Sequence, residues 1–379
     1  MKLRLLFTVT AILGIALSGF AQSEFEDNIG RQTFEMMAKT QGFYENEALL
    51  SFVVYVGKRL EAQMEENEYD FKYYLVDVQE PNAFATAGGY VYVTRGLLSI
   101  IDTEDELACV LGHEFTHVLH KHSNKKIGRE VLPTVLEIPG NLVGTFMAEN
   151  LGALLNLPIE VASKSINSIF DRHQENDADE NGVKLAAKAG YDPKALETAL
   201  NKLQLYVEIE GSGSERFSIF DNHPLTSHRV ENIEKVLAGM TYEPKKQLHI
   251  LGRTEGIVLG DNPKSGLVVK GNKFLHPDMN LSLQLPKNWD VQNTPAALTT
   301  ISKGKNSGLV MGLDSKHSNT QEAAKATMKK LEGKKVDIDY TETFDINGFS
   351  ASKLVVESGR GGAKSIAVWV NLGEESGLL

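Results

Sequence analysis

The sequence predicts an α+β protein in which a mainly helical first domain with a small β-sheet is followed by a second, β-rich α+β domain. Apolar residues recur at helical spacing through most of the first part of the chain, which predicts amphipathic helices around a core. Beyond residue 241, short runs alternate between apolar and polar residues, as half-buried strands do. A chain of 379 residues has room for both domains.

The first domain is expected to hold two strands between its helices. Glu-Pro-Asn at 80–82 ends the first apolar run, and Gly88-Gly89 precedes the second. Thr103 and Glu106 have the spacing of a capping box and predict the start of a helix. The expected helices are 24–67, 103–123, 164–188, 193–207 and one capped by Thr226 or Ser227, with short helices over 130–170, and the expected strands are 71–78 and 90–94.

The second domain is recognised by a change of pattern near residue 242. Leu281, Leu283 and Leu285 alternate with polar residues and predict a strand. Further strands are expected over 349–356 and 365–372, with a helix over 321–331 before them. The expected parts of the chain are a signal peptide over 1–21, the first domain over 22–241 and the accessory domain over 242–379.

The first residues have the pattern of an export signal. Lys2 and Arg4 are basic, 5–17 is apolar, and 18–21 offers small residues for cleavage. The apolar run is shorter than the roughly 20 residues of a membrane span. We expect a periplasmic or secreted protein after cleavage of this signal peptide, with a retained N-terminal membrane anchor as the alternative.

The net charge and the cysteine content argue against nucleic-acid binding and against cysteine-based sites. The formal net charge of -11 argues against a nucleic-acid partner, because such proteins neutralise phosphates with basic patches. Cys109 is the only cysteine, so no disulfide framework and no cysteine-based zinc site is expected. Any transition metal must therefore be held by histidine and carboxylate.

The segment His113-Glu-Phe-Thr-His117 has the spacing that a zinc ion requires. Residues four apart lie on one face of a helix, so both imidazoles can bind the same ion. Glu114 projects about 100° round the helix axis. It can therefore take a proton from a water activated by the metal without binding the metal itself.

The alternative is that these are ordinary residues on a helix surface. Leu107, Val110, Leu111, Val118 and Leu119 are apolar, which places the two histidines on or beside a buried face. Partly buried histidines need polar partners, so the pattern favours a metal site over a solvated surface.

A third protein ligand is expected, since catalytic zinc usually has three and an open position. His120 lies about 10 Å along the axis from His113, given a rise of 1.5 Å per residue. His122 would point to the opposite face of a continuing helix. Cys109 shares the stripe of His113 but is equally stretched along the axis, and a lone cysteine there is more often a core residue. The ligand should come from another helix.

The acidic segment 171–179 is the best source of that ligand. Asp171, Glu175 and Asp179 are spaced by four and form a carboxylate stripe on one helix face. Like charges stacked in this way are destabilising unless a cation or a donor compensates them. One carboxylate could bind zinc while the next accepts the N–H of a ligating histidine. A solvated acidic face is the alternative, and the pattern leaves open which carboxylate is the ligand.

These two segments together resemble the zinc metallopeptidases that include the CAAX prenyl proteases and HtpX, most closely the soluble periplasmic, BepA-like branch. The similarity extends over about 40–240. It implies a gluzincin-type zincin domain with one Zn²⁺ per chain. It also implies Glu175 as the third ligand beside His113 and His117, and Asp179 as the carboxylate that orients a ligating histidine.

Further segments carry the same resemblance. Asn82-Ala83-Phe84-Ala85 with Gly88-Gly89 is similar to the family's strand beside the active-site cleft, where an exposed edge could pair with an extended substrate. His223 and Arg229 are similar to residues near the metal in relatives. The resemblance implies that Arg229 stabilises the oxyanion and that His223 occupies the open metal position in a latent state.

The patterns and the resemblance leave two functions. The favoured one is an endopeptidase with Glu114 as general base. The resemblance and the expected location imply unfolded or misassembled envelope proteins as its substrates, in quality control, and a membrane-proximal protein complex as a partner. The alternative is a chaperone-like envelope assembly factor with a structural metal. The intact Glu114 favours the enzyme, because a structural site needs no general base.

Overall fold

A computed structural model describes most of the chain outside its N-terminal segment and one long internal segment. The expected signal peptide over 1–21 and, apart from Phe170, the short helices expected over 130–170 lie outside the described residues. The chain divides into two compact units, with a boundary between Asp261 and Asn262, and each unit is described by itself. The described residues are 26–65, 68–122, 170–210, 223–224, 227–243, 249–250, 252–269, 272–295, 297–302, 307–314, 316–333, 336–357 and 364–373.

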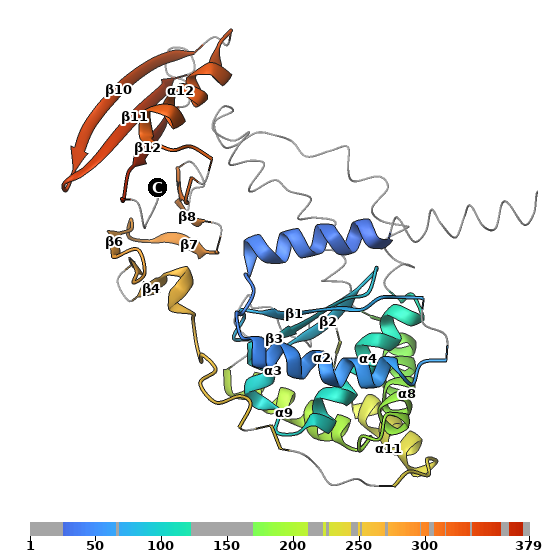
Figure 1. Cartoon of the computed structure of the whole chain (residues 1–379). Helices are drawn as coiled ribbons and strands as arrows, with labels where there is room; N and C mark the ends of the chain where they lie inside the picture. The colour runs from blue at the N-terminus through green and yellow to red at the C-terminus, as the bar shows by residue number, and fades with distance from the viewer. Residues whose placement is uncertain are drawn as a thin grey trace, which may run out of the picture. The chain divides into compact units, whose positions relative to one another are not determined.

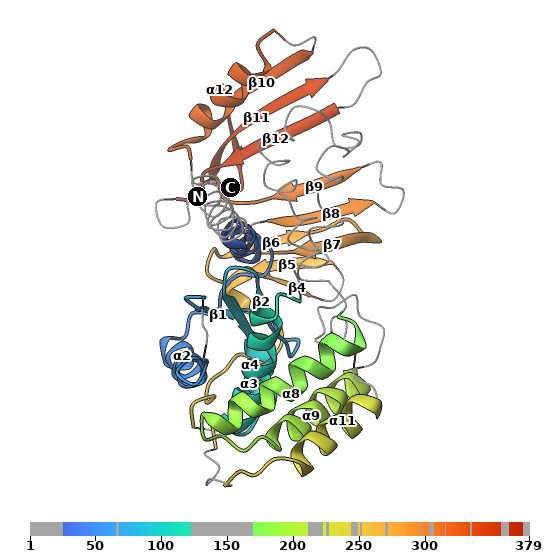
Figure 2. The same ribbon diagram turned by 90° about the vertical axis from the view of Figure 1, so that its right-hand side faces the viewer.

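The first unit combines helices with one small sheet (Figures 1 and 2). A helix over 26–40 precedes the labelled elements. The labelled elements are α2 (Glu47–Glu61), β1 (Lys72–Val76), β2 (Ala83–Thr86), β3 (Tyr90–Thr94), α3 (Arg95–Ile100), α4 (Glu104–Leu119), α8 (Arg172–Lys188), α9 (Ala195–Glu210) and α11 (Ser227–Ala238).

The sheet has the strand order β1-β3-β2, so β2 lies at one edge. β3 pairs in parallel with β1 and antiparallel with β2. The helix over 26–40 packs on one face through Met36 and Met37, and α2 and α4 pack on the other face (Figure 1). Because both faces are covered, all five residues of β3 are buried and no alternation of polar residues is seen.

The first predicted helix is two helices in the structure. The helix over 26–40 ends before Gly42, which has a φ of 76° that favours glycine. The chain then re-enters a helix at α2, where the Asn46 side chain caps the N–H of Leu49. A pattern of apolar residues continues across this break, which is why the prediction over 24–67 ran through it.

The predicted start of α4 is confirmed. The Thr103 side chain accepts from the N–H of Glu106, and the Glu106 carboxylate accepts from the N–H of Thr103. The helix ends at Leu119 and not at the predicted residue 123. Lys121 then takes a left-handed φ of 52°, which turns the chain back on itself.

The helices α4 and α8 cross at two glycines. A Cβ built on Gly182 would lie 2.6 Å from the backbone nitrogen of His113, and one built on Gly112 would lie 2.7 Å from the carbonyl oxygen of Gly182. Any larger side chain at either position would hold the backbones apart. This close crossing brings the acidic start of α8 to the His113 turn of α4.

The start of α8 differs from the prediction. Phe170 and Asp171 are not helical, and the helix begins at Arg172 instead of near residue 164. Asp171 is the N-cap, and its side chain accepts from the N–H groups of His173 and Gln174. The remainder of the expected segment, 164–169, lies outside the described residues.

The described residues of the segment 242–261 belong to the first unit. The buried guanidinium of Arg95 forms an ion pair with Asp77 at 2.5 Å. It also donates to the carbonyl oxygens of Val258 and Gly260. Arg95 therefore fastens this segment to the start of α3.

The second unit contains three sheets of three strands among its described residues, with the orders β4-β5-β6, β7-β8-β9 and β10-β11-β12. Phe274, Leu285 and Leu298 form one small core, and a second core joins α12 to β11. The unit is therefore α+β, as predicted. Its elements are β4 (Leu267–Val269), β5 (Lys273–His276), β6 (Leu281–Gln284), β7 (Trp289–Asn293), β8 (Leu298–Ser302), β9 (Gly308–Met311), α12 (Thr320–Leu331), β10 (Asp337–Ile346), β11 (Phe349–Glu357) and β12 (Lys364–Val370), with a short 3₁₀ helix at Pro263–Ser265.

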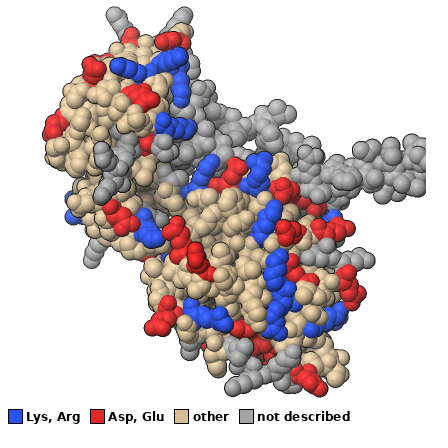
Figure 3. All heavy atoms as spheres, in the orientation of Figure 1, with Lys and Arg blue, Asp and Glu red and all other residues tan. Residues whose placement is uncertain are grey.

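Within the described residues, no helix combines the length and the apolar character needed to cross a bilayer. Acidic and basic side chains are interspersed on the face drawn in Figure 3. The excess of acidic residues in the sequence is thus not gathered into one acidic region on that face.

Candidate metal centre

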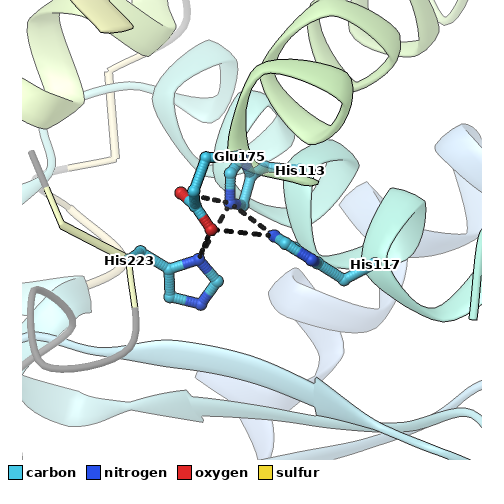
Figure 4. A group of neighbouring side chains, drawn as sticks. All are labelled: His113, His117, Glu175 and His223. Atoms are coloured by element: carbon cyan, nitrogen blue, oxygen red, sulfur yellow. Dashed lines mark hydrogen bonds and ion pairs between the residues drawn. The ribbon is translucent and has the colours of Figure 1, made fainter. Parts of the chain in front are cut away.

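The helix α4 presents the HExxH residues to the interior of the first unit. His113, Glu114 and His117 are all buried. The two imidazoles face each other with 3.0 Å between their Nε2 atoms, as expected for side chains one turn apart. They converge on one point beside the start of α8 (Figure 4).

Two carboxylates from α8 meet these histidines. Glu175 Oε1 lies 3.4 Å from His117 Nε2, and Glu175 Oε2 lies 3.7 Å from His113 Nε2. Asp179 binds the other side of the His113 ring, with its Oδ1 2.9 Å from Nδ1. The spacing of four residues thus puts one carboxylate in front of the His113 ring and one behind it.

His223 joins the group from outside both helices. Its Nδ1 lies 2.9 Å from Glu175 Oε1 and 3.1 Å from His113 Nε2. Its Nε2 lies 3.6 Å from Glu114 Oε1. The ligand atoms of His113, His117, Glu175 and His223 all lie within 4.8 Å of one another, so these four side chains can hold a metal ion.

Arg229 on α11 binds the two carboxylates of α8. Its Nε and Nη2 donate to Asp179 at 2.6 and 2.8 Å, and its Nη1 lies 2.7 Å from Glu175 Oε2. Nη1 also donates to the carbonyl oxygen of His223 at 3.3 Å. Arg229 therefore links α11 and the His223 loop to the carboxylates that face the histidines.

Burial and charge shift the pKa values in this group. Burial raises the pKa of Glu114, since an ionised carboxylate loses its water there. Burial also opposes ionisation of Glu175, but the neighbouring His223 and His117 hold its pKa well below the usual value. For His117, burial lowers the pKa and keeps the ring neutral, which is the form that binds metals.

The residues present fit a divalent cation. Glu114, Glu175 and Asp179 are buried carboxylates, and Arg229 is the buried guanidinium among them. Burial opposes protonation of His223, but the neighbouring Glu175 and Glu114 raise its pKa. Even with His223 charged, three carboxylates face two cationic side chains, and an excess of buried negative charge is costly unless a cation balances it. Oε1 of Glu114 is buried and has no hydrogen-bond partner. Two imidazoles and a carboxylate are a donor set typical of zinc.

The expected substrate strand lies next to Glu114. Ala85 on β2 donates its N–H to Glu114 Oε2 at 3.2 Å, so this side of β2 faces the candidate centre. β2 is an edge strand as expected, but it is not exposed, because Ala83–Thr86 are all buried. Gly88 and Gly89 have φ values of 80° and 78° and form the turn to β3. Asn82 is buried at the start of the strand.

Three other candidates lie elsewhere. Asp171 is used as the N-cap of α8 and is not part of the four-residue group. Cys109 is buried, with Sγ 3.5 Å from the carbonyl oxygen of Asp192, and is a core residue. His120 is also outside the group, as its axial distance predicted.

Sequence reasoning missed two neighbours of the centre. The Phe170 ring lies 3.9 Å from the His117 ring between centroids, and no sequence pattern pointed to it. His122 was expected on the opposite helix face, but its Nδ1 lies 3.0 Å from His117 Nδ1. The cause is the left-handed Lys121 after the end of α4. A histidine just past a helix end was the available signal.

The sequence is similar to one known protein family and to several individual proteins. The model described as Peptidase family M48 matches residues 53–237. The chain is 31% identical over 168 residues to metalloprotease LoiP of Escherichia coli K12, an alignment that covers 43% of this chain and 61% of that protein. It is 32% identical over 159 residues to the β-barrel assembly-enhancing protease of Yersinia pestis, covering 41% of this chain and 32% of that protein.

A mitochondrial protein is also similar to part of the chain. The chain is 30% identical over 194 residues to the mitochondrial metalloendopeptidase OMA1 of Schizosaccharomyces pombe, covering 49% of this chain and 52% of that protein. The chain thus spans between 32% and 61% of the lengths of these three relatives. Proteins with peptidase names from bacteria and from mitochondria are therefore each similar to part of this chain.

Proposed function

We propose that the chain belongs to peptidase family M48, whose model matches residues 53–237, and that it is a zinc-dependent endopeptidase with Glu114 as its general base. The observation that carries the proposal is the position of Glu114. Its carboxylate is buried beside the donor atoms of His113, His117 and Glu175, and one of its oxygens has no hydrogen-bond partner. A base placed in this way is ready to accept a proton from a reacting water.

The proposed roles of the residues follow from their contacts. His113, His117 and Glu175 hold the ion, and Asp179 fixes the His113 ring through Nδ1. Zinc, when bound, supplies Lewis acidity that polarises a peptide carbonyl and acidifies water. Glu114 takes the proton of the attacking water and delivers it to the amine nitrogen as the peptide bond breaks. The raised pKa of Glu114 suits a group that must both accept and return a proton.

His223 and Arg229 are proposed to regulate and assist this site. His223 contacts Glu175, His113 and Glu114 at once, in the space where a substrate carbonyl would have to enter. This supports a latent state in which His223 must leave before substrate binds. Arg229 already binds Asp179 and Glu175. We propose that it orients both carboxylates and that its nearby charge stabilises the oxyanion.

The proposed substrate is an extended polypeptide that pairs with the outer edge of β2, so that recognition uses backbone hydrogen bonds with Ala83–Ala85. Asn82, Gly88 and Gly89 would position this strand and its turn. Because β2 is buried, binding requires a conformational change that uncovers the edge. A protein that selects substrates in this way favours unfolded chains over folded ones.

We further propose a role in envelope protein quality control, after export directed by residues 1–21. The name of the Yersinia pestis relative, a β-barrel assembly-enhancing protease, supports misassembled envelope proteins as substrates and a membrane-proximal complex as partner. In this proposal 22–241 is a gluzincin-type peptidase domain and 242–379 is an accessory domain. The alternative, a chaperone-like factor with a structural metal, has no use for a Glu114 oxygen that is buried beside the ligands without a hydrogen-bond partner.

Casein hydrolysis tests the proposal. The wild-type chain should cleave casein, a chelator should abolish cleavage, and Glu114→Gln should lower it by about a hundredfold or more while its zinc content equals that of the wild type. Glu231→Gln on the exposed face of α11 is the control. Full cleavage by Glu114→Gln would refute the role of the base.

The latent state has a separate test. If His223 occupies the substrate position, His223→Ala should raise casein cleavage several-fold and leave zinc content unchanged. Equal activity and equal metal affinity in wild type and His223→Ala would refute the latent state. Loss of zinc in His223→Ala would make His223 a permanent ligand instead.

A further inference from the structure

A second group of ligand side chains lies just beyond the end of α4. His120, His122 and Asp177 have ligand atoms that all lie within 4.8 Å of one another. They share no residue with the group of His113, His117, Glu175 and His223. We propose that these three residues form a second transition-metal site, and that its occupancy opposes metal binding at the first. The second part of this statement rests on the proposed function, whereas the first part does not.

One oxygen of Asp177 is the centre of this group. Oδ2 is in contact with His120 Nδ1 and lies 3.3 Å from His122 Nε2. The other oxygen, Oδ1, accepts from Asn181 Nδ2 at 3.0 Å. Asn181 therefore holds the carboxylate in an orientation that turns one oxygen toward both imidazoles.

The backbone after α4 brings the two histidines together. The helix ends at Leu119, His120 is its C-cap, and Lys121 has a left-handed φ of 52°. This turn reverses the chain, and His122 donates its backbone N–H to the carbonyl oxygen of His117 at 2.9 Å. His120 and His122 thus approach Asp177 together, although they are only two residues apart.

The environment of the group suits a metal ion taken from solution. The His120 and Asp177 side chains are 44% and 37% exposed, while that of His122 is 5% exposed. The open side lets an ion enter and leaves positions for water. Two imidazoles and one carboxylate suit zinc, copper, nickel and cobalt better than calcium or magnesium, which prefer oxygen ligands.

A single hydrogen bond couples this site to the first. His117 must keep its proton on Nδ1 when Nε2 binds a metal, and this Nδ1 lies 3.0 Å from His122 Nδ1. His122 must then accept at Nδ1, so its own proton lies on Nε2 and points to Asp177. This arrangement gives His117 an acceptor for its second ring nitrogen, as metal-binding histidines require.

A metal at the second site breaks this arrangement. Binding through His122 Nε2 displaces the proton there, and a neutral His122 ring must then carry it on Nδ1. Two N–H groups, those of His117 and His122, would face each other across 3.0 Å. One ring has to lose its metal, lose a proton or turn away. Metal binding at one site therefore lowers the metal affinity of the other site. Excess metal should for this reason inhibit the peptidase.

The test is a zinc titration of the untagged full chain after its metal has been removed. Equilibrium dialysis with metal analysis should find two zinc ions per wild-type chain, with the second bound at least about tenfold more weakly than the first. His120→Ala and Asp177→Asn should each bind one. His173→Ala, which removes an exposed histidine of α8 outside both groups, is the matched control and should bind two.

Casein cleavage gives the second readout. Zinc added beyond the first equivalent should inhibit wild type and His173→Ala, and His120→Ala should keep its basal activity and resist this inhibition. If His120→Ala still bound two ions, the second site would be refuted. Equal inhibition of His120→Ala and wild type would overturn the coupling. If the wild type bound one ion and His120→Ala bound none, the ion would lie at the second site. That result would support the second site and refute the first, so the two proposals can fail separately.

Discussion

The crossing of α4 and α8 at two glycines predicts that Gly182→Ala will damage the metal centre more than it damages the fold. A Cβ at this position would lie 2.6 Å from the His113 nitrogen and 2.9 Å from the carbonyl carbon of Gly112. Both are backbone atoms that no side-chain rotation can move. Ordinary carbon contacts need about 3.5 Å, so the helices must separate by roughly 1 Å.

Two effects on stability partly cancel. Overpacking a tight contact costs about 1–3 kcal/mol. Alanine is better than glycine inside a helix by about 1 kcal/mol. The net loss for Gly182→Ala is therefore about 0–2 kcal/mol, and the protein should remain folded. Metal–ligand distances, however, tolerate only about 0.2 Å, so a shift of roughly 1 Å between His113 and Glu175 should lower zinc affinity by about tenfold or more.

Two measurements on the same variant separate these effects. Urea denaturation of the metal-free protein gives the stability change, and competition with a chromophoric chelator gives the zinc affinity. Gly252→Ala is the control, because a Cβ there would meet nothing within 4 Å, and it should change neither quantity. Zinc affinity of Gly182→Ala equal to that of the wild type would refute the idea that this crossing sets the geometry of the centre.

Three further predictions concern residues outside the group of ligands. Asp171→Ala should lose about 1 kcal/mol of stability, measured in urea, and keep its zinc, whereas Glu175→Ala should lose the zinc; equal zinc loss in both would contradict the N-cap role. Arg95→Ala should lose about 3–5 kcal/mol because it breaks the buried ion pair between Arg95 and Asp77, and a loss below about 1 kcal/mol would show the ion pair to be unimportant. Burial raises the pKa of the Cys109 thiol, so a disulfide reagent should react only after unfolding in urea; rapid reaction of the native protein would disprove its burial.

The sequence predicted best where a short-range rule determines the structure. The capping box at Thr103 set the start of α4, and the spacing of four residues put His113 and His117 together. The same spacing put Glu175 and Asp179 on the two sides of one imidazole. The spacing within each helix follows from the geometry of a single helix. The meeting of the α8 carboxylates with the His113 ring also needs the close crossing of α4 and α8, which the spacing did not predict.

The strands of the second unit were harder to predict. β6, β11, β12 and the helix α12 were found near their true positions, but β10 was missed although it is the longest of the described strands. Its burial is mostly low, but its sequence does alternate, with Ile338, Tyr340, Phe344 and Ile346 between polar residues and Glu342 as the one interruption, so a period of two was present and was overlooked. Asn347-Gly348, both with positive φ, closes the β10–β11 hairpin and was a further signal that could have revealed it.

Near His117, reasoning from helical spacing gave a wrong prediction for the position of His122. Spacing arguments assume that the helix continues, and on that assumption His122 faced away from the centre. Two residues decide otherwise: α4 stops at Leu119, and Lys121 reverses the backbone. The result is that His113 is oriented by a carboxylate directly, whereas His117 reaches its carboxylate through a second imidazole. Only the connection through His122 can be interrupted, because a metal ion can replace the proton that His122 holds toward Asp177. Because of this difference, metal binding at the first site can be regulated through His117 and not through His113.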